Sequence, residues 1–384
     1  MGKAAARHER PGEVIGCRMR LVEHSLHCYS LRYERPVQWS DVVEVAAPFV
    51  LLRLVGESGA TGVAEITVKP TWCGVTARSL IAALEEMFLP LLARLDLDDP
   101  AAVRVALDRI PDNAAAKTLI DNACWDLAAA ADGKPLWWRW GGRQHVPMSF
   151  ALTRQAPILM AAEAEAMVAR HGFAVLKVKG GQGFETDQEG MRAIRAAVGH
   201  GVRLYVDANG AYPREDAARY VALMADAGAE MVEDPSPLEP DANFSALQAG
   251  CPVPVLVDFG CTSLRDAEQF MARGARALSI KPGRFGLTQS RAMHRAAHAA
   301  GCRPVVGLMG ESALGTLTGL QFAATLDEAT LLAELSWYLA MQEQVTVHTP
   351  RIAGGMLELP AAGSVASLVD WAAVEAFSRE TRAA

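Results

Sequence analysis

The chain has 384 residues, of which 51% are apolar and 21% charged, and its net charge is −7 at pH 7. A chain this long and apolar folds around a large core, and its acidic balance offers no attraction to nucleic acid or to an anionic membrane. Its seven cysteines show no C-x-x-C spacing, which argues against a disulfide framework or a cysteine-based zinc site. With no signal-peptide pattern and no membrane-length apolar run, we predict a cytoplasmic protein.

The first third of the sequence predicts a small α+β domain. Residues 1–15 are small or charged and are expected to be a disordered terminus. Apolar and polar residues alternate over 16–65, which indicates antiparallel strands, whereas the apolar spacing over 76–131 is helical. We therefore predict a capping domain over residues 16–141.

The next two hundred residues, 142–340, alternate short apolar runs with helical segments, which is typical of βα units around a parallel sheet. There are eight such apolar runs. They end at or near Phe150, Lys179, Asp207, Glu233, Asp258, Lys281, Gly307 and Glu334. Successive gaps from the second run onward are 28, 26, 25, 23, 26 and 27 residues, room for a strand, two short loops and a helix. Such regular spacing, without a Gly-rich phosphate turn, favours a closed TIM-like α/β barrel over an open doubly wound sheet. The extended, Gly-rich segment 341–384 is expected to return to the capping domain.

Three acidic residues follow consecutive predicted strands: Asp207, Glu233 and Asp258. The carboxyl ends of barrel strands form one rim, so these carboxylates should converge there. Unpaired, they would repel one another strongly, whereas a hard divalent cation such as Mg²⁺, or Mn²⁺ in its place, would neutralise them. Helix capping or pairing with arginine would explain a single acid but explains three in successive repeats poorly.

Lysines stand beside these acids. Lys177 and Lys179 share one face of their strand, and Lys281 follows four strands later, on the opposite side of a circular rim. A lysine desolvated near a cation has a lowered pKa and can act as a general base, while a metal-bound carboxylate has a more acidic α-proton. The pattern predicts proton abstraction α to a carboxylate, with solvated strand ends as the alternative.

The order K-x-K, D-x-N, E-x-P, D and K-x-x-R-x-G, with residues 310–315 beyond, resembles the enolase superfamily and most of all its muconate lactonizing enzyme-like subgroup. The resemblance implies an α+β capping domain on a (β/α)7β barrel and an enediolate stabilised by Mg²⁺. It implies further that Lys179 and Lys281 form the acid/base pair, that Lys177 stabilises the substrate carboxylate or tunes its neighbour, and that the three acids named above bind the metal. Such families commonly form homo-oligomers.

One position departs from the family pattern. Relatives often carry Asp-Glu-Ser after the fifth strand, where this chain reads Asp258-Phe259-Gly260. The ligand remains but the carboxylate behind it is lost, so the hydrogen-bond partner of Lys281 is left open.

The reaction and the substrate are less well specified by the sequence. Lysines on both faces of the substrate's α-carbon permit racemisation or epimerisation. A cycloisomerase of the muconate type or a dehydratase of a hydroxylated acid needs only one of the two lysines. An inactive relative that merely binds a ligand is the non-enzyme alternative. Residues 333–337 lack the Asp-x-Asp of relatives that act on dipeptides, which disfavours a dipeptide epimerase.

Loops 33–41 and 69–74 are the expected selectors of a small carboxylate substrate. We predict six substrate-binding residues: Asn209, Glu311, Trp337, Trp72, Trp39 and Tyr33. The four aromatic residues would enclose a cationic nitrogen, which favours a betaine or a proline-like or N-substituted amino acid, unless they simply pack the domain seam.

Overall fold

The computed structural model describes residues 19–40, 42–326 and 333–383. The segment predicted to be disordered, 1–15, therefore lies outside the described residues, as do position 41 and the first half of the predicted eighth strand, residues 330–332. None of the described helices has the length and apolarity that a membrane crossing requires.

The N-terminal region forms an antiparallel sheet in the order β1-β2-β3, comprising β1 (Leu21–Gln38), β2 (Val43–Gly56) and β3 (Thr61–Thr67). Its helices are α1 (Pro70–Cys73), α2 (Ala77–Ala83), α3 (Leu89–Leu92), α4 (Pro100–Leu107), α5 (Ala114–Asp132) and α6 (Leu136–Arg139), with a π-helical turn at Leu84–Phe88. The long helix α5 packs very close to β3 at Gly62. A Cβ at this position would lie only 2.4 Å from the carbonyl oxygen of Ala123. Glycine is required at this contact.

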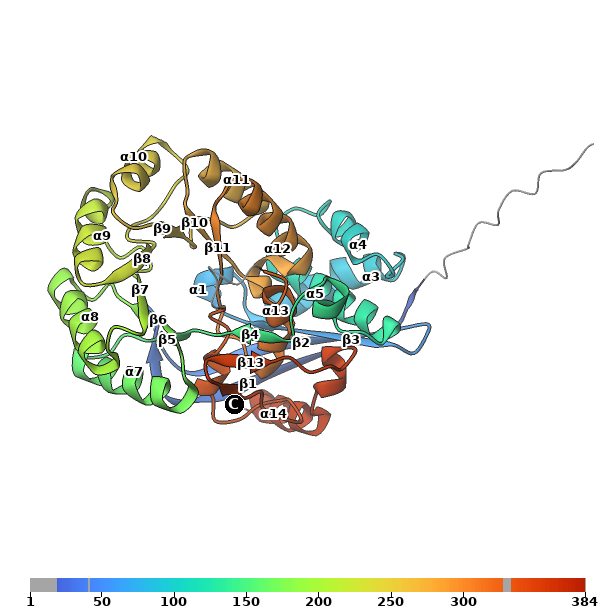
Figure 1. Ribbon diagram of the computed structural model, residues 1–384. Helices are drawn as coiled ribbons and strands as arrows, with labels where there is room; N and C mark the ends of the chain where they lie inside the picture. The colour runs from blue at the N-terminus through green and yellow to red at the C-terminus, as the bar shows by residue number, and fades with distance from the viewer. Residues whose placement is uncertain (1–18, 41, 327–332, 384) are drawn as a thin grey trace, which may run out of the picture.

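A seven-stranded parallel sheet follows, in the order β11-β10-β9-β8-β7-β6-β5. Its strands are β5 (Phe150–Leu152), β6 (Val175–Lys179), β7 (Arg203–Asp207), β8 (Ala229–Glu233), β9 (Val255–Val257), β10 (Ala277–Ile280) and β11 (Arg303–Val306). The helices that connect or follow them are α7 (Pro157–His171), α8 (Phe184–Val198), α9 (Ala217–Asp226), α10 (Ala242–Gly250), α11 (Leu264–Ala272), α12 (Pro282–Ala299) and α13 (Ala313–Ala323). The strands curve as part of a barrel with helices on the outside (Figure 1). The predicted α/β fold class is confirmed.

The two ends of this sheet are joined at the position of the predicted eighth strand. The amide of Ala333 donates to the carbonyl of Pro147 at 3.0 Å, and the carbonyl of Ala333 accepts from Ser149 at 2.9 Å. On the other side, the amide of Glu334 donates to the carbonyl of Val306 in β11 at 2.9 Å. Ala333 and Glu334 thus connect the start of β5 with the end of β11, and the side chain of Glu334 is buried there.

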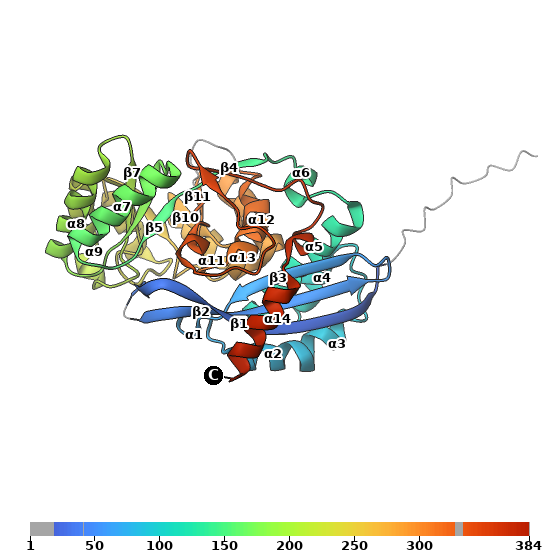
Figure 2. The ribbon, with the colours of Figure 1, turned by 90° about the horizontal axis from the view of Figure 1, so that it is seen from below.

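The C-terminal segment contacts both parts of the molecule. Strand β12 (Ile352–Ala353) pairs with β13 (Met356–Glu358), which in turn pairs with β4 (His145–Pro147) beside the barrel. Helix α14 (Trp371–Ala383) crosses the N-terminal sheet (Figure 2), where the ring of Trp371 lies 5.6 Å from that of His27 in β1.

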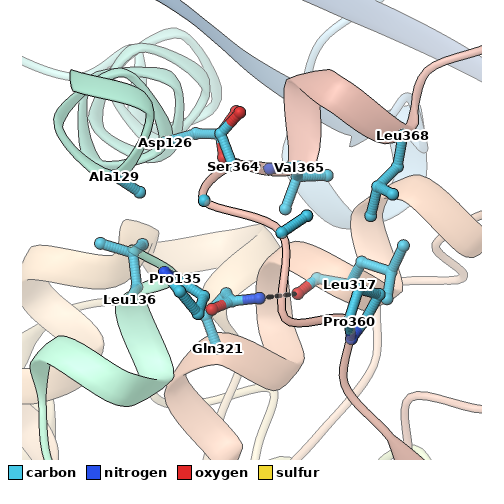
Figure 3. A pocket seen from close by; sticks show the side chains of 12 residues that line it. Asp126, Ala129, Pro135, Leu136, Leu317, Gln321, Pro360, Ser364, Val365 and Leu368 are labelled. Atoms are coloured by element: carbon cyan, nitrogen blue, oxygen red, sulfur yellow. Dashed lines mark hydrogen bonds between the residues drawn. The ribbon is translucent and has the colours of Figure 1, made fainter. Parts of the chain in front are cut away.

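A buried carboxylate ties this segment to the N-terminal region. Asp126, on α5, accepts the backbone N–H groups of Val63 at 2.9 Å, Val365 at 2.6 Å and Ala366 at 3.0 Å. Figure 3 shows Asp126 and Val365 on either side of this seam, which holds a cavity of about 10 Å³. Such a volume holds at most about one water molecule, so the seam is structural and not a ligand site.

Replacing Asp126 with Ala should therefore lower the free energy of unfolding by about 3 kcal/mol, because three buried N–H donors lose their acceptor. Urea denaturation followed by circular dichroism measures the change. Asp132→Ala, at the half-exposed end of the same helix, is the control and should cost less than about 1 kcal/mol. Equal midpoints for the two variants would contradict the role assigned to Asp126.

Candidate active site

The interior of the parallel sheet has an apolar floor. One residue from each of six strands contributes to it: Val175, Tyr205, Met231, Leu256, Ala277 and Val305. Residues two apart on a strand share a face, so positions two or four residues beyond the floor toward the carboxyl ends also point inward, and six of them are charged. These positions are Lys177, Lys179, Asp207, Glu233, Asp258 and Lys281, and all six side chains are buried. The sequence-predicted lysines and acids are therefore brought together above the floor.

Three carboxylates lie close enough to share an ion: Glu233, Asp234 and Asp258 each offer an oxygen within 4.8 Å of the others. The Oδ1 atom of Asp258 is buried and has no hydrogen-bond donor in the described structure. The carboxylate of Asp234 accepts the backbone N–H groups of Asp258 at 3.1 Å and Phe259 at 2.7 Å, so it also fixes the loop that carries Asp258. A buried set of oxygen ligands with an unsatisfied atom fits a hard divalent cation such as Mg²⁺.

Charge repulsion in this group is visible in its pKa values. Burial and the neighbouring carboxylates raise the pKa of Glu233 well above its usual value and that of Asp234 to about 7. Burial alone would raise the pKa of Asp258 as well, but the ammonium of Lys281 and the guanidinium of Arg284 lower it to about 2. Added positive charge is what would ionise all three acids together.

Asp207, the remaining predicted ligand, lies with the lysines. Its Oδ2 atom is 2.6 Å from Nζ of Lys179 and 3.1 Å from Nζ of Lys177. Despite burial, these two ammonium groups lower the pKa of Asp207 far below its usual value. The close carboxylate group thus contains Asp234 where the sequence suggested Asp207.

Lys177 is held by carboxylates on several sides. Its Nζ donates to Glu233 Oε1 at 2.9 Å and to Glu334 at 3.1 and 3.2 Å, in addition to its contact with Asp207. Burial would lower the pKa of Lys177, but these acids raise it well above the usual value. Tyr205 donates a short hydrogen bond to the same Glu334. Lys177 therefore stays charged and offsets buried negative charge.

Lys179 is in a different state although it lies only two residues away. Its Nζ contacts Asp207 and, at 3.0 Å, the side-chain oxygen of Asn209. Burial, together with the charge of Lys177, lowers the pKa of Lys179 below its usual value, as the sequence predicts for a general base. Asn209, which we expected to contact substrate, positions this lysine in the structure.

Lys281 forms an ion pair with Asp258, on the side of the carboxylate group away from Lys179. Its Nζ lies 2.5 Å from Asp258 Oδ2, so Lys179 and Lys281 bind carboxylates from β7 and from the end of β9, on either side of β8. Phe259, in place of the usual acid, points outward with 58% of its surface exposed and leaves Asp258 as the partner of Lys281 among the described residues. Space for Lys281 depends on Gly307, where a Cβ would lie 2.6 Å from Lys281 Cε.

The four predicted aromatic residues do gather at the mouth of the barrel. The ring of Trp39 lies 4.1 Å from that of Trp337 and 6.4 Å from that of Trp72, and Tyr33 lies 5.9 Å from Trp337. The rings already face cations of the protein itself: Nζ of Lys69, Lys179 and Lys281 lie 5.5, 5.8 and 5.5 Å from the centre of Trp72.

Glu311, also predicted to bind substrate, is buried near the same mouth. Its Oε2 accepts the amide of Met309 at 2.8 Å, while its Oε1 has no donor in the described part of the chain. Burial raises the pKa of Glu311 to about 7. A free oxygen at this position is available to a ligand.

Residues 25–139 match the N-terminal domain of the mandelate racemase / muconate lactonizing enzyme family, and residues 159–363 match the enolase C-terminal domain-like family. The chain belongs to the mandelate racemase/muconate lactonizing enzyme family of the enolase superfamily. It is 30% identical to an N-succinylamino acid racemase from Thermus thermophilus over 79% of this chain and 83% of that protein. It is 26% identical to muconate cycloisomerase 1 from Rhodococcus opacus over 90% and 95% of the two chains. A muconate lactonizing enzyme from Mycobacterium smegmatis, solved with muconolactone, superposes with a TM-score of 0.89 at 26% identity, covering 93% of this chain and 99% of that one.

Sequence analysis did not predict a role for four residues that the structure places in or beside this site. They are Asp234, Glu334, Lys69 and Glu44. Asp234 is the variable position of the E-x-P motif, and Glu334 closes the predicted eighth strand, so both had a positional signal. Lys69 falls in the expected selector loop without any motif, and Glu44 carries none at all.

Adding one methyl group at Gly307 tests the position of Lys281. A Cβ there would meet Ser279 Oγ at 2.4 Å and Lys281 Cε at 2.6 Å, both of which are movable side-chain atoms. Gly307→Ala should therefore fold but displace the ammonium, lowering the rate of α-proton exchange about a hundredfold. The control is Gly190→Ala, in α8, where an added Cβ has no neighbour within 4 Å. Exchange at the wild-type rate in Gly307→Ala would show that Lys281 does not need this placement.

Proposed function

We propose that this chain racemises or epimerises an N-substituted amino acid by removing the proton α to its carboxylate and returning a proton to the opposite face. The observation that carries the proposal is the pair of buried lysines, Lys179 and Lys281, anchored to carboxylates on the two flanks of β8. A racemase needs one base on each face of the α-carbon, and a buried amine in this setting suits that role.

A divalent cation, Mg²⁺ in the first instance, would be held by Glu233, Asp258 and, as we propose, Asp207, and would supply Lewis-acid stabilisation of the negative charge that develops on the carboxylate. The other groups have supporting roles. Lys177 stays charged between Glu233 and Glu334 and adds positive potential, while Asp234 fixes the loop of Asp258 through two backbone N–H groups.

The relatives support this choice of reaction without deciding it. The N-succinylamino acid racemase at 30% identity supports an acylated amino acid as substrate, and an L-Ala-D/L-Glu epimerase from Bacillus subtilis is 29% identical over 73% of this chain. The muconate cycloisomerases, which match 90% of the chain, support lactonisation as the second candidate. A betaine substrate is not supported, because the protein's own ammonium groups already face the Trp72 ring.

Proton NMR in D₂O with Mg²⁺ tests the reaction on both enantiomers of N-acyl, N-methyl, proline and betaine amino acids, with cis,cis-muconate alongside. Wild type should exchange the α-proton of both enantiomers of an N-acyl amino acid. Lys179→Ala should slow the exchange of one enantiomer at least about a hundredfold, and Lys281→Ala should do the same for the other enantiomer. The reason is that general-base catalysis contributes a rate enhancement of about 10²–10⁴. Lactone formation from muconate with no exchange in the amino acids would replace the proposal with the cycloisomerase.

Mg²⁺ binding, measured by isothermal titration calorimetry, tests the ligand set independently of any substrate. We expect Glu233→Gln, Asp258→Asn and Asp207→Asn each to abolish detectable binding, and Asp234→Asn to weaken it about tenfold through the loop it holds. The control is Glu230→Gln, an exposed acid on the same strand that pairs with Arg203 at 2.7 Å. If Asp234→Asn abolishes binding while Asp207→Asn does not, the third ligand is Asp234.

A further inference from the structure

Lys69 is a buried cation that the capping sheet delivers to the barrel mouth. It directly follows the β3 region and is 3% exposed. The turn around it is tight: its carbonyl accepts the N–H groups of Trp72 at 2.9 Å and Cys73 at 2.8 Å, and its own amide donates to Cys73 Sγ at 3.3 Å. The relative placement of Lys69 and Trp72 is therefore fixed by the backbone.

The ammonium of Lys69 has fewer partners than it can bind. Glu44 Oε2, at 2.5 Å, is the one carboxylate within ion-pair distance in the described structure, and an ammonium has three N–H donors. Glu44 in turn accepts from Trp39 Nε1 at 3.1 Å and Tyr33 Oη at 3.5 Å, so its charge is offset by three donors. A buried N–H donor without an acceptor destabilises the fold, more so when it is charged, and a ligand oxygen that accepted the hydrogen bond would remove that cost.

The position of Lys69 relative to the catalytic lysines sets the reach of such a ligand. Nζ of Lys69 and Nζ of Lys281 each lie 5.5 Å from the centre of the Trp72 ring, so they are at most about 11 Å apart. Gly310 lets the chain pass close to Lys69, because a Cβ there would lie 3.0 Å from Lys69 Cε and 3.6 Å from its Nζ. An acyl arm of about two residue lengths, roughly 7 Å, spans from an α-carbon beside Lys281 toward Lys69.

We propose that Lys69 is a specificity-determining residue that binds a second carboxylate, carried on the substrate's N-substituent or otherwise remote from the reacting one. The inference rests on the proposed function and refines its substrate to a dicarboxylate. A cationic substituent is disfavoured at this position because three lysine side chains already face the Trp72 ring.

The test compares three forms of phenylalanine that differ only in the N-substituent: N-succinyl, N-butyryl and N-trimethyl. Exchange of the α-proton in D₂O with Mg²⁺ gives kcat/KM for each. Wild type should prefer the succinyl form, and Lys69→Met should lower that preference about a hundredfold while leaving the butyryl form nearly unchanged. Glu44→Gln/Lys69→Met should behave alike, since it removes the carboxylate that the single variant leaves unpaired. Lys134→Met, which removes an exposed lysine 4.3 Å over Trp138, is the matched control.

Equal losses on the succinyl and butyryl forms in both Lys69 variants would show a structural role and overturn the proposal, as would a wild-type preference for the trimethyl form. Tryptophan fluorescence titrations separate this result from failure of the proposed function. If no amino acid exchanges, yet N-succinyl-phenylalanine or muconate quenches wild type and binds Lys69→Met at least tenfold more weakly, the carboxylate site stands and the reaction is wrong. Binding that is indifferent to Lys69 overturns the site.

Discussion

Compensation of buried negative charge is the constraint on which the rest of the site depends. The barrel interior places Asp207, Glu233 and Glu334 around a single ammonium, that of Lys177, where water does not reach. In such an environment charges interact far more strongly than in water, and an uncompensated carboxylate is costly. Lys177, Lys179 and Lys281 balance only part of the charge of these acids and of Asp234 and Asp258, and added positive charge, from a cation or from protonation, would balance the rest. The same shortage that makes the site costly to fold makes it able to bind a cation.

Lys177 and Lys179 gain their different character from this balance. Lys177 is saturated by acids and its pKa is raised, whereas Lys179 contacts one carboxylate, lies near another ammonium and has a lowered pKa. Two residues on the same face of one strand thus differ in their pKa, which is raised for Lys177 and lowered for Lys179, and the lowered value fits the proton transfer proposed for Lys179. The strand period that puts them side by side is what allows the first to tune the second.

Much of this arrangement was predictable because it follows from periodicity. The strand spacing predicts the barrel, and the two-residue alternation predicts that Asp207, Glu233 and Asp258 point inward like Tyr205, Met231 and Leu256 before them. The sequence could not give the position of Asp234, whose side chain turns back to the backbone of the loop after β9. Nor could it give the pairing of Lys69 with Glu44, because Glu44 lies on β2, Lys69 follows the end of β3, and no local pattern links them.

The split between the barrel and the capping sheet explains why fold and metal site do not choose a substrate. The lysines and the acids come from the strand ends of a fold that this chain shares with a racemase and with muconate cycloisomerases, so the barrel alone does not select the reaction. Lys69 and Glu44 come from the sheet that covers this mouth, and their placement can change without moving any barrel strand. Selectivity can therefore vary in the capping sheet while the chemistry of Lys179 and Lys281 stays in place. A charged residue at that position discriminates between substrates by the sign of the charge on the group far from the reacting carbon. Contacts with the barrel residues alone would not discriminate between such substrates.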